Sequence, residues 1–157
     1  MASKTQHFPK FSIVQGDIKV KISLDRFGRQ YQDAQFWLDS QVMTDMVPYM
    51  PHQTGTFVNI TRAMSAALAG SGKVVAAAPP MGRFLYEGKT MVDVLTGSPW
   101  ARKGAKKVLV GQYGGKTKAK ENLTYGNPKA TPHWFDTAKK NHGKAWVDGV
   151  KKRAGGR

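Results

Sequence analysis

The chain of 157 residues contains no cysteine, which excludes disulfides, thiolate metal sites and cysteine nucleophiles. It also lacks any apolar run near the ~20 residues that a membrane-spanning helix needs. Its first seven residues, up to His7, are polar and lack the apolar segment of a secretory signal. We therefore expect no membrane partner and a protein that is made in the cytoplasm.

Acidic residues are scarce in the second half of the chain. Only Glu121, Asp136 and Asp148 follow Trp100, against fifteen of the 25 lysines and arginines. Residues 101–157 therefore carry a net charge of +12 out of a total of +15. This asymmetry predicts an anionic partner, either a nucleic acid or an acidic protein surface.

A chain of this length predicts a single domain. The expected fold class is α+β, with a long N-terminal helix packed on a small antiparallel sheet, an extended basic arm and a C-terminal helix. The expected boundaries are an N-terminal extension with the first hairpin strand at 1–17, a core at 18–88, an interaction arm at 89–130 and a helix at 131–153.

The N-terminal part shows first a strand pattern and then a helix pattern. Apolar and polar residues alternate from Lys10 to Leu24 around a Gly-Asp turn, which predicts a β-hairpin. Apolar residues then recur every three or four positions over 27–49, which predicts a long helix that ends at two prolines. Phe36 and Trp37 broaden its apolar face, and they are expected either in the core or against a neighbouring subunit.

The middle of the chain predicts a second pair of strands. Residues 57–64 and 73–78 are apolar segments separated by a glycine-rich break, and we expect them to pair antiparallel, with the second one in the core. Residues 82–89 predict one helical turn or a tight aromatic corner. After Lys89 periodicity disappears for about forty residues rich in glycine, which indicates a functional loop or an interaction arm.

The last element is predicted to be a helix, with Thr131 as its N-cap and Pro132 at its first position. Asp136 in the first turn and the cations at 151–153 suit the helix dipole.

No catalytic, cofactor or metal motif stands out. The four histidines lack the spacing of a zinc site. Residues 70–73, Gly-Ser-Gly-Lys, lack the frame of a phosphate loop, so we expect a turn. A small nuclease remains an alternative that would need Glu87 beside His133 or His142, which the sequence does not bring together. We therefore predict no enzyme, no cofactor and no small-molecule substrate.

A basic segment in the arm is the strongest candidate for a binding site. Four cations lie within six residues beside an indole, an arrangement that suits phosphates and a stacked base. The pattern is more often that of a solvated basic loop or of a loop that binds an acidic protein. The candidate contact residues are Trp100, Arg102, Lys103, Lys106 and Lys107.

Several blocks together resemble the minor capsid protein family of tailed bacteriophages, which are head–tail connector or neck proteins. Residues 48–57 (PYMPHQTGTF) resemble its P-x-x-T-G corner, and residues 82–93 (GRFLYEGKTMVD) resemble its ARYLYYGKVMVD segment. Residues 96–107 are similar to its next block, and residues 127–143 to its C-terminal P-H-W helix. Two departures are a His-Gln pair at 52–53 in place of a charged pair, and Gly82 in place of alanine.

The resemblance implies a non-enzymatic virion protein that forms an oligomeric ring in the neck around the DNA channel. Its partners would be further copies, other connector and tail proteins, and packaged DNA through non-specific backbone contacts. A tail completion or tail terminator protein of the same fold type is the alternative, followed by a free basic nucleic-acid-binding module. The expected subunit-interface residues are Phe84, Tyr86, Met91 and Trp134.

Overall fold

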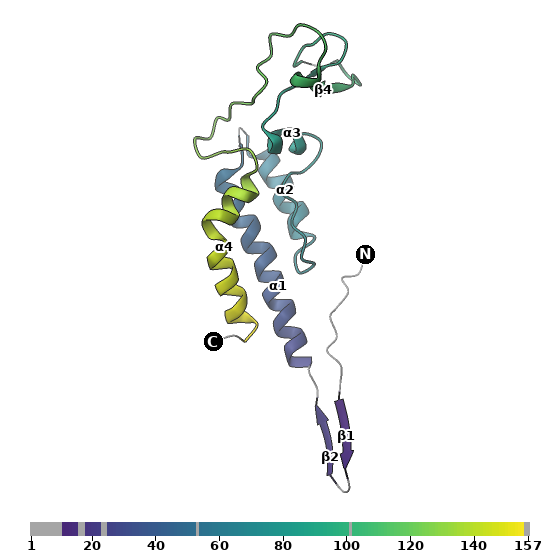
Figure 1. The fold of residues 1–157 in the computed structure, drawn as a ribbon, viewed down its shortest axis with the longest axis vertical. Coiled ribbons are helices and arrows are strands. Elements are labelled where there is room, and N and C mark those ends of the chain that lie inside the picture. Colours follow the sequence, from purple (N-terminus) through teal and green to yellow (C-terminus); the bar gives the residue numbers. More distant parts are fainter. Residues whose placement is uncertain (1–10, 16–17, 23–24, 53, 101, 156–157) are drawn as a thin grey trace.

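The computed structural model describes residues 11–15, 18–22, 25–52, 54–100 and 102–155. The chain has a mixed α and β fold with a long N-terminal helix and a C-terminal helix, as predicted. In Figure 1 the helices occupy the middle of an elongated molecule, with a two-stranded antiparallel sheet toward each end. The two long helices are α1 (Asp25–Met46) and α4 (Trp134–Arg153).

The N-terminal hairpin is confirmed. Strand β1 (Phe11–Gln15) pairs antiparallel with β2 (Ile18–Ile22), with Ile13 opposite Val20. In Figure 1 the hairpin extends beyond the N-terminal end of α1, away from the other helices. The predicted packing of the long helix on a sheet is wrong, because α1 packs mainly along α4.

Helices α1 and α4 run antiparallel and are joined by polar as well as apolar contacts. The indole Nε1 of Trp146 donates a hydrogen bond to Asp45 Oδ2 at 2.6 Å. A side chain at Gly149 would overlap the ring of Trp37, so this glycine allows the indole to lie directly against α4. Trp37 is therefore half-buried against α4, whereas Phe36 on the neighbouring face stays 57% exposed.

The core lies at the end of the bundle where the helices meet the arm. Met43 and Met46 of α1, and Met50 directly after the 3-10 turn η1 (Val47–Tyr49), belong to the same buried cluster as Trp134, which has no exposed surface. The predicted long helix is confirmed, but the first part of its apolar stripe is not in the core. Phe27 is 48% exposed. The buried members of the cluster are Val42, Met43, Met46, Met50, Val58, Trp134, Ala138 and Trp146.

The segment predicted as a strand at 57–64 is instead helix α2 (Thr56–Ala66). Its buried side chains are Val58, Thr61 and Ser65, which recur at helical spacing and are two-thirds polar. The β-branched and aromatic composition favours a strand. The helix forms nevertheless, because the hydroxyls of Thr61 and Ser65 make hydrogen bonds to backbone groups of another segment inside the subunit.

That segment is 73–78, which has no regular secondary structure and pairs with no strand, so the predicted antiparallel pair is wrong. Ser65 Oγ donates to Val75 O and accepts from Val75 N, both at 3.0 Å. Thr61 Oγ1 accepts from Ala78 N at 3.2 Å, and Trp134 Nε1 donates to Ala76 O at 2.9 Å. Side chains of two helices thus satisfy the backbone groups that a neighbouring strand would satisfy in a sheet.

Helix α3 (Gly82–Glu87) follows a cis peptide between the prolines at 79 and 80, and it confirms the predicted single helical turn. An added Cβ at Gly82 would lie 2.6 Å from Ala77 C and 2.8 Å from Ala77 O. The departure from alanine at this position therefore has a structural cause, since backbone atoms cannot move aside as a flexible side chain can.

Gly82→Ala should lower the free energy of unfolding by about 1–3 kcal/mol, because it overpacks a backbone contact. Urea denaturation followed by circular dichroism measures the change. Gly143→Ala in α4 is the matched control, because its Cβ would meet only Lys139 Cγ at 3.8 Å. That variant should gain up to about 1 kcal/mol from helix propensity. Equal stability of the two variants would contradict the close contact at Gly82.

The start of α4 differs from its prediction. The helix begins at Trp134, and His133 precedes it in the left-handed region with φ 51°. Its backbone N–H donates to Tyr86 O at 2.8 Å, which ties this end of α4 to α3. Thr131 is therefore not the N-cap, and its hydroxyl instead lies 3.0 Å from that of Thr137.

Candidate interaction arm

The arm between α3 and α4 is more ordered than its lack of periodicity predicts. Strand β3 (Met91–Asp93) pairs antiparallel with β4 (Lys107–Leu109), and the 3-10 turn η2 (Val110–Gln112) follows. At its base the outgoing and returning chains are joined, because Thr90 N donates to Glu121 O at 2.9 Å. Figure 1 shows the arm leaving the helical bundle next to α3 and returning to the start of α4.

The connection between β3 and β4 is organised by one buried carboxylate, Asp93. Its Oδ1 accepts from the backbone N–H of Leu95 at 2.8 Å, and its Oδ2 accepts from Arg102 Nε at 3.2 Å. The Asp93 side chain has no exposed surface, whereas the side chain of Arg102 is 60% exposed. One of the four cations of the basic segment therefore has a structural partner inside the subunit.

These contacts hold the pKa of the Asp93 carboxyl below its ordinary value of 3.8. The largest cause is the hydrogen bond from the Leu95 amide, followed by the hydrogen bond from the Arg102 side chain. A pKa that folding lowers means that the charged carboxylate stabilises the turn above pH 3.8. This stabilisation is lost as the pH falls through the lowered pKa.

Acidification below pH 3.8 should therefore reduce the hydrogen-exchange protection of the Leu95 amide while that of the α1 amides stays high. Asp93→Asn should show the reduced Leu95 protection already at pH 7, because the charge-assisted bond to Arg102 is lost. Amide exchange measured by NMR, corrected for the intrinsic rate at each pH, checks both. Equal Leu95 protection in the two proteins at pH 7 would show that the carboxylate does not order the turn.

The other residues of the basic segment are free to contact a partner. Trp100 is 88% exposed, and Lys103, Lys106 and Lys107 are all exposed. None of the ion pairs in the described part of the chain involves these three lysines. The turn therefore presents an indole and three unpaired ammonium groups at the surface.

The four expected interface residues occupy different environments. Trp134 lies fully inside the subunit, with its ring centroid 4.8 Å from that of Tyr86, so it is a core residue and not a surface for a neighbour. Phe84 and Tyr86 of α3 are half-buried, as is Met91 at the start of β3. Burial raises the pKa of the Tyr86 hydroxyl, with smaller contributions from Asp136 and Glu87.

The structure brings Glu87 and His133 together, which the sequence could not show. His133 Nε2 lies 3.3 Å from Glu87 Oε2, and its Nδ1 lies 3.9 Å from Asp136 Oδ2. The three side chains are 48–68% exposed, and none of them lines the groove described below. These contacts form a polar link at the surface between α3 and the start of α4.

The Gly-Ser-Gly-Lys segment at 70–73 has its amides already bound. Asp39 Oδ2 accepts from Gly70 N at 2.8 Å and from Gly72 N at 3.0 Å. Gln35 Nε2 donates to the other oxygen of the same carboxylate at 2.7 Å. A phosphate cannot occupy the position that Asp39 holds, so the segment acts as a turn that is anchored to α1.

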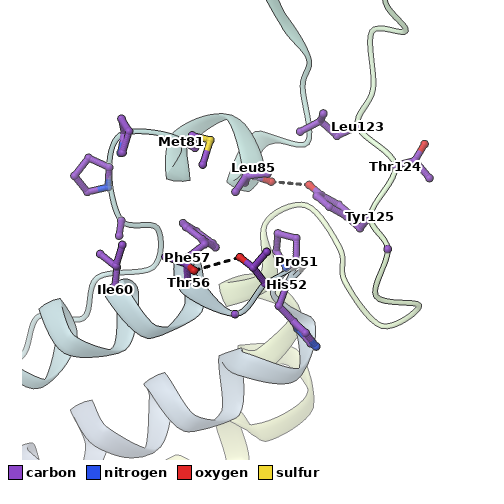
Figure 2. A pocket seen from close by; sticks show the side chains of 16 residues that line it. Pro51, His52, Thr56, Phe57, Ile60, Met81, Leu85, Leu123, Thr124 and Tyr125 are labelled. Atoms are coloured by element: carbon purple, nitrogen blue, oxygen red, sulfur yellow. Dashed lines mark hydrogen bonds between the residues drawn. The ribbon is translucent and has the colours of Figure 1, made fainter. Parts of the chain in front are cut away.

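An open groove lies where α2, α3 and the returning arm meet, with a volume of about 360 Å³. Figure 2 shows Phe57, Met81 and Leu85 on one part of its wall and Leu123 and Tyr125 on the other. The Tyr125 hydroxyl donates to Leu85 O at 2.6 Å and fixes the returning chain against α3. Burial raises the pKa of this hydroxyl.

The groove was not predicted, because it depends on the contact between two segments forty residues apart. The sequence does contain a pattern that could have indicated the α2 side of the groove. Ile60, Met64 and Leu68 recur every four residues, which indicates a helix with an apolar face.

Among the described residues no group of three or more histidine, aspartate or glutamate side chains could hold a metal ion. Within the same ranges no helix is both long and apolar enough to cross a bilayer.

Comparison of the chain with protein-family models, curated proteins and solved structures gave no match. Its function is therefore inferred from the arm, the groove and the sequence motifs.

Proposed function

We propose that this chain is a non-enzymatic structural protein of a tailed-phage virion. It forms an oligomeric ring in the neck that joins the head connector to the tail around the DNA channel. The motifs at 48–57, 82–107 and 127–143 support the family, and the shape of the subunit supports a role in assembly. The protein is made in the host cytoplasm and acts in the virion.

The observation that carries this proposal is the arm. It is built around its own buried carboxylate, Asp93, and it presents Leu95 and Trp100 to solvent at 74% and 88% exposure. A turn that is ordered internally but exposes large apolar side chains is typical of a surface that is covered by another molecule. Exposed cations beside them suit either the DNA or an acidic connector protein.

The mass of the purified protein tests the proposal, measured by light scattering alone and with the portal complex of the virion, at low and high salt. We expect a ring of defined mass, formed either alone or when the connector proteins are added. A monomer that does not bind these proteins but binds DNA with a steep salt dependence would overturn the neck function and indicate a nucleic-acid-binding module instead.

A tail completion protein is the second candidate within the same family, and the basic arm suits it equally. Binding to isolated tails but not to the portal complex would favour that role. Binding to the portal complex before tails are added would favour the neck.

A further inference from the structure

Helix α2 exposes an apolar face that nothing in the described subunit covers. Ile60 and Met64 of α2 are 45% and 39% exposed, and Leu68 in the turn after α2 is 38% exposed, while the polar Thr61 and Ser65 are buried. The helix buries Val58 on its inner face but also leaves large apolar side chains exposed on its outer face, whereas an ordinary surface helix carries polar residues there. An exposed apolar face of this kind suits contact with a second apolar surface.

The apolar face continues into the groove. Ile60 belongs to both, and Figure 2 shows it near the proline turn that leads to Met81. Met81 is 62% exposed, and Phe57 and Leu85 form the adjoining wall. Together the face and the groove form one surface, which we call the apolar groove surface.

The chain carries a second apolar surface of a convex kind. Residues 94–100 at the end of the arm contain no charged side chain and expose Val94, Leu95 and Trp100 at 40%, 74% and 88%. Gly97 lies against the ring of Tyr113, and Thr117 Oγ1 donates to Gly97 O at 2.6 Å. We call residues 94–100 the arm tip. Contacts with Tyr113 and Thr117 hold the arm tip on its inner side, and its apolar side chains are exposed to solvent.

Charge restricts what can cover these surfaces. No lysine, arginine, aspartate or glutamate lines the groove, in a chain with a net charge of +15. Two copies that approached through most of their basic surface would bring cations together, at a cost in Coulomb energy. The groove lining and residues 94–100 of the arm tip carry no charged side chain, so a contact between them adds no repulsion of its own, and both surfaces are apolar.

We propose that the arm tip of one copy docks in the apolar groove surface of the next copy. The two surfaces are different parts of the chain, so the contact is head-to-tail, and repetition of a head-to-tail contact gives a closed ring or a filament. This inference rests on the proposed ring and names the contact that builds it. The occupant of the groove is then Leu95 and Trp100 of the neighbour.

The size of the contact fits assembly in a ring better than a stable dimer. A groove of about 360 Å³ has room for an aromatic anchor. An aromatic side chain buries ~150–250 Å², however, whereas a stable interface needs ~800 Å² from each partner. The face of α2 adds to the area, but each contact stays weak until ring closure adds further contacts.

The absence of cysteine allows a direct test by crosslinking. Leu95→Cys labels the arm tip, Met81→Cys labels the groove, and Thr44→Cys, on the exposed side of α1, is the control. Each full-length variant is treated with a short bismaleimide, alone and in equal mixtures. The mixture of Leu95→Cys with Met81→Cys should give at least tenfold more crosslinked dimer than either mixture with Thr44→Cys. Each variant alone should give little.

Other outcomes separate the contact from the ring. A yield no higher than that of the control mixtures overturns the contact, and light scattering of the unmodified protein then shows whether a ring forms by other surfaces. Strong dimerisation of Leu95→Cys alone would also overturn the inference, because it would show a symmetric contact between arm tips. A strong mixed crosslink in a protein that never forms a closed ring would keep the contact and reject the neck ring.

Discussion

Trp134→Ala should lower the free energy of unfolding by about 3–5 kcal/mol, the range for removing a large aromatic side chain from a core. The indole has no exposed surface, packs edge-on against Tyr86 and Phe57, and donates to Ala76 O at 2.9 Å. Its loss creates a cavity and also leaves the carbonyl of Ala76 without its partner. Chemical denaturation followed by far-UV circular dichroism measures the effect.

The chain supplies its own control, because Trp100 is the same residue type at 88% exposure. Trp100→Ala should change the free energy of unfolding by no more than about 0.5 kcal/mol, as is usual for a surface substitution. Trp100→Ala should nevertheless weaken association between subunits, because Trp100 belongs to the proposed contact. Trp134→Ala should affect association only by destabilising the fold. A similar loss of stability in both variants would mean that the arm tip packs inside the folded subunit.

Replacing Lys103, Lys106 and Lys107 together with glutamine should reduce the slope of log affinity for double-stranded DNA against log salt by about three. Each of these lysines is exposed, and in the described part of the chain none is held in an ion pair. Arg102 is left unchanged, because its bond to Asp93 orders the turn. Fluorescence anisotropy of a labelled duplex between 50 and 200 mM salt measures the slope.

Lys139, Lys140 and Lys144 of α4 provide the charge-matched control, since they are also exposed. Their replacement removes the same charge from another surface and should leave the slope closer to that of the unmodified protein. An unchanged slope in the arm variant would show that these lysines do not face DNA, and an acidic protein would become the expected partner. Equal effects in both variants would indicate binding by net charge alone.

The sequence predicted those elements whose apolar residues recur at the spacing of a strand or of a helix. The hairpin and α1 were found because their stripes continue for several periods. Helix α2 was missed because its buried residues include Thr61 and Ser65, whose burial depends on hydrogen bonds to a segment ten or more residues away. No local pattern shows that such a partner exists.

The candidate site was predicted in composition but not in geometry. The exposure of Trp100 and the three lysines follows from their polar, glycine-containing context. The pairing of Arg102 with the buried Asp93 requires the turn to fold back across nine residues. Trp134 was expected at a subunit interface from the family resemblance alone, and its packing places it in the core.

The way the arm is attached has a consequence for how this chain can change over time. Its two ends meet at one place, where Leu123 N donates to Gly88 O at 2.8 Å and Lys89 pairs with Asn122. The two ends of the arm are therefore adjacent anchor points on the helical part of the subunit. The length, charge and tip of the arm can vary without changing a residue of the core, and such sites tolerate inserted sequence best. One scaffold can thus adapt to partners of different size by exchanging the segment between two adjacent anchor points.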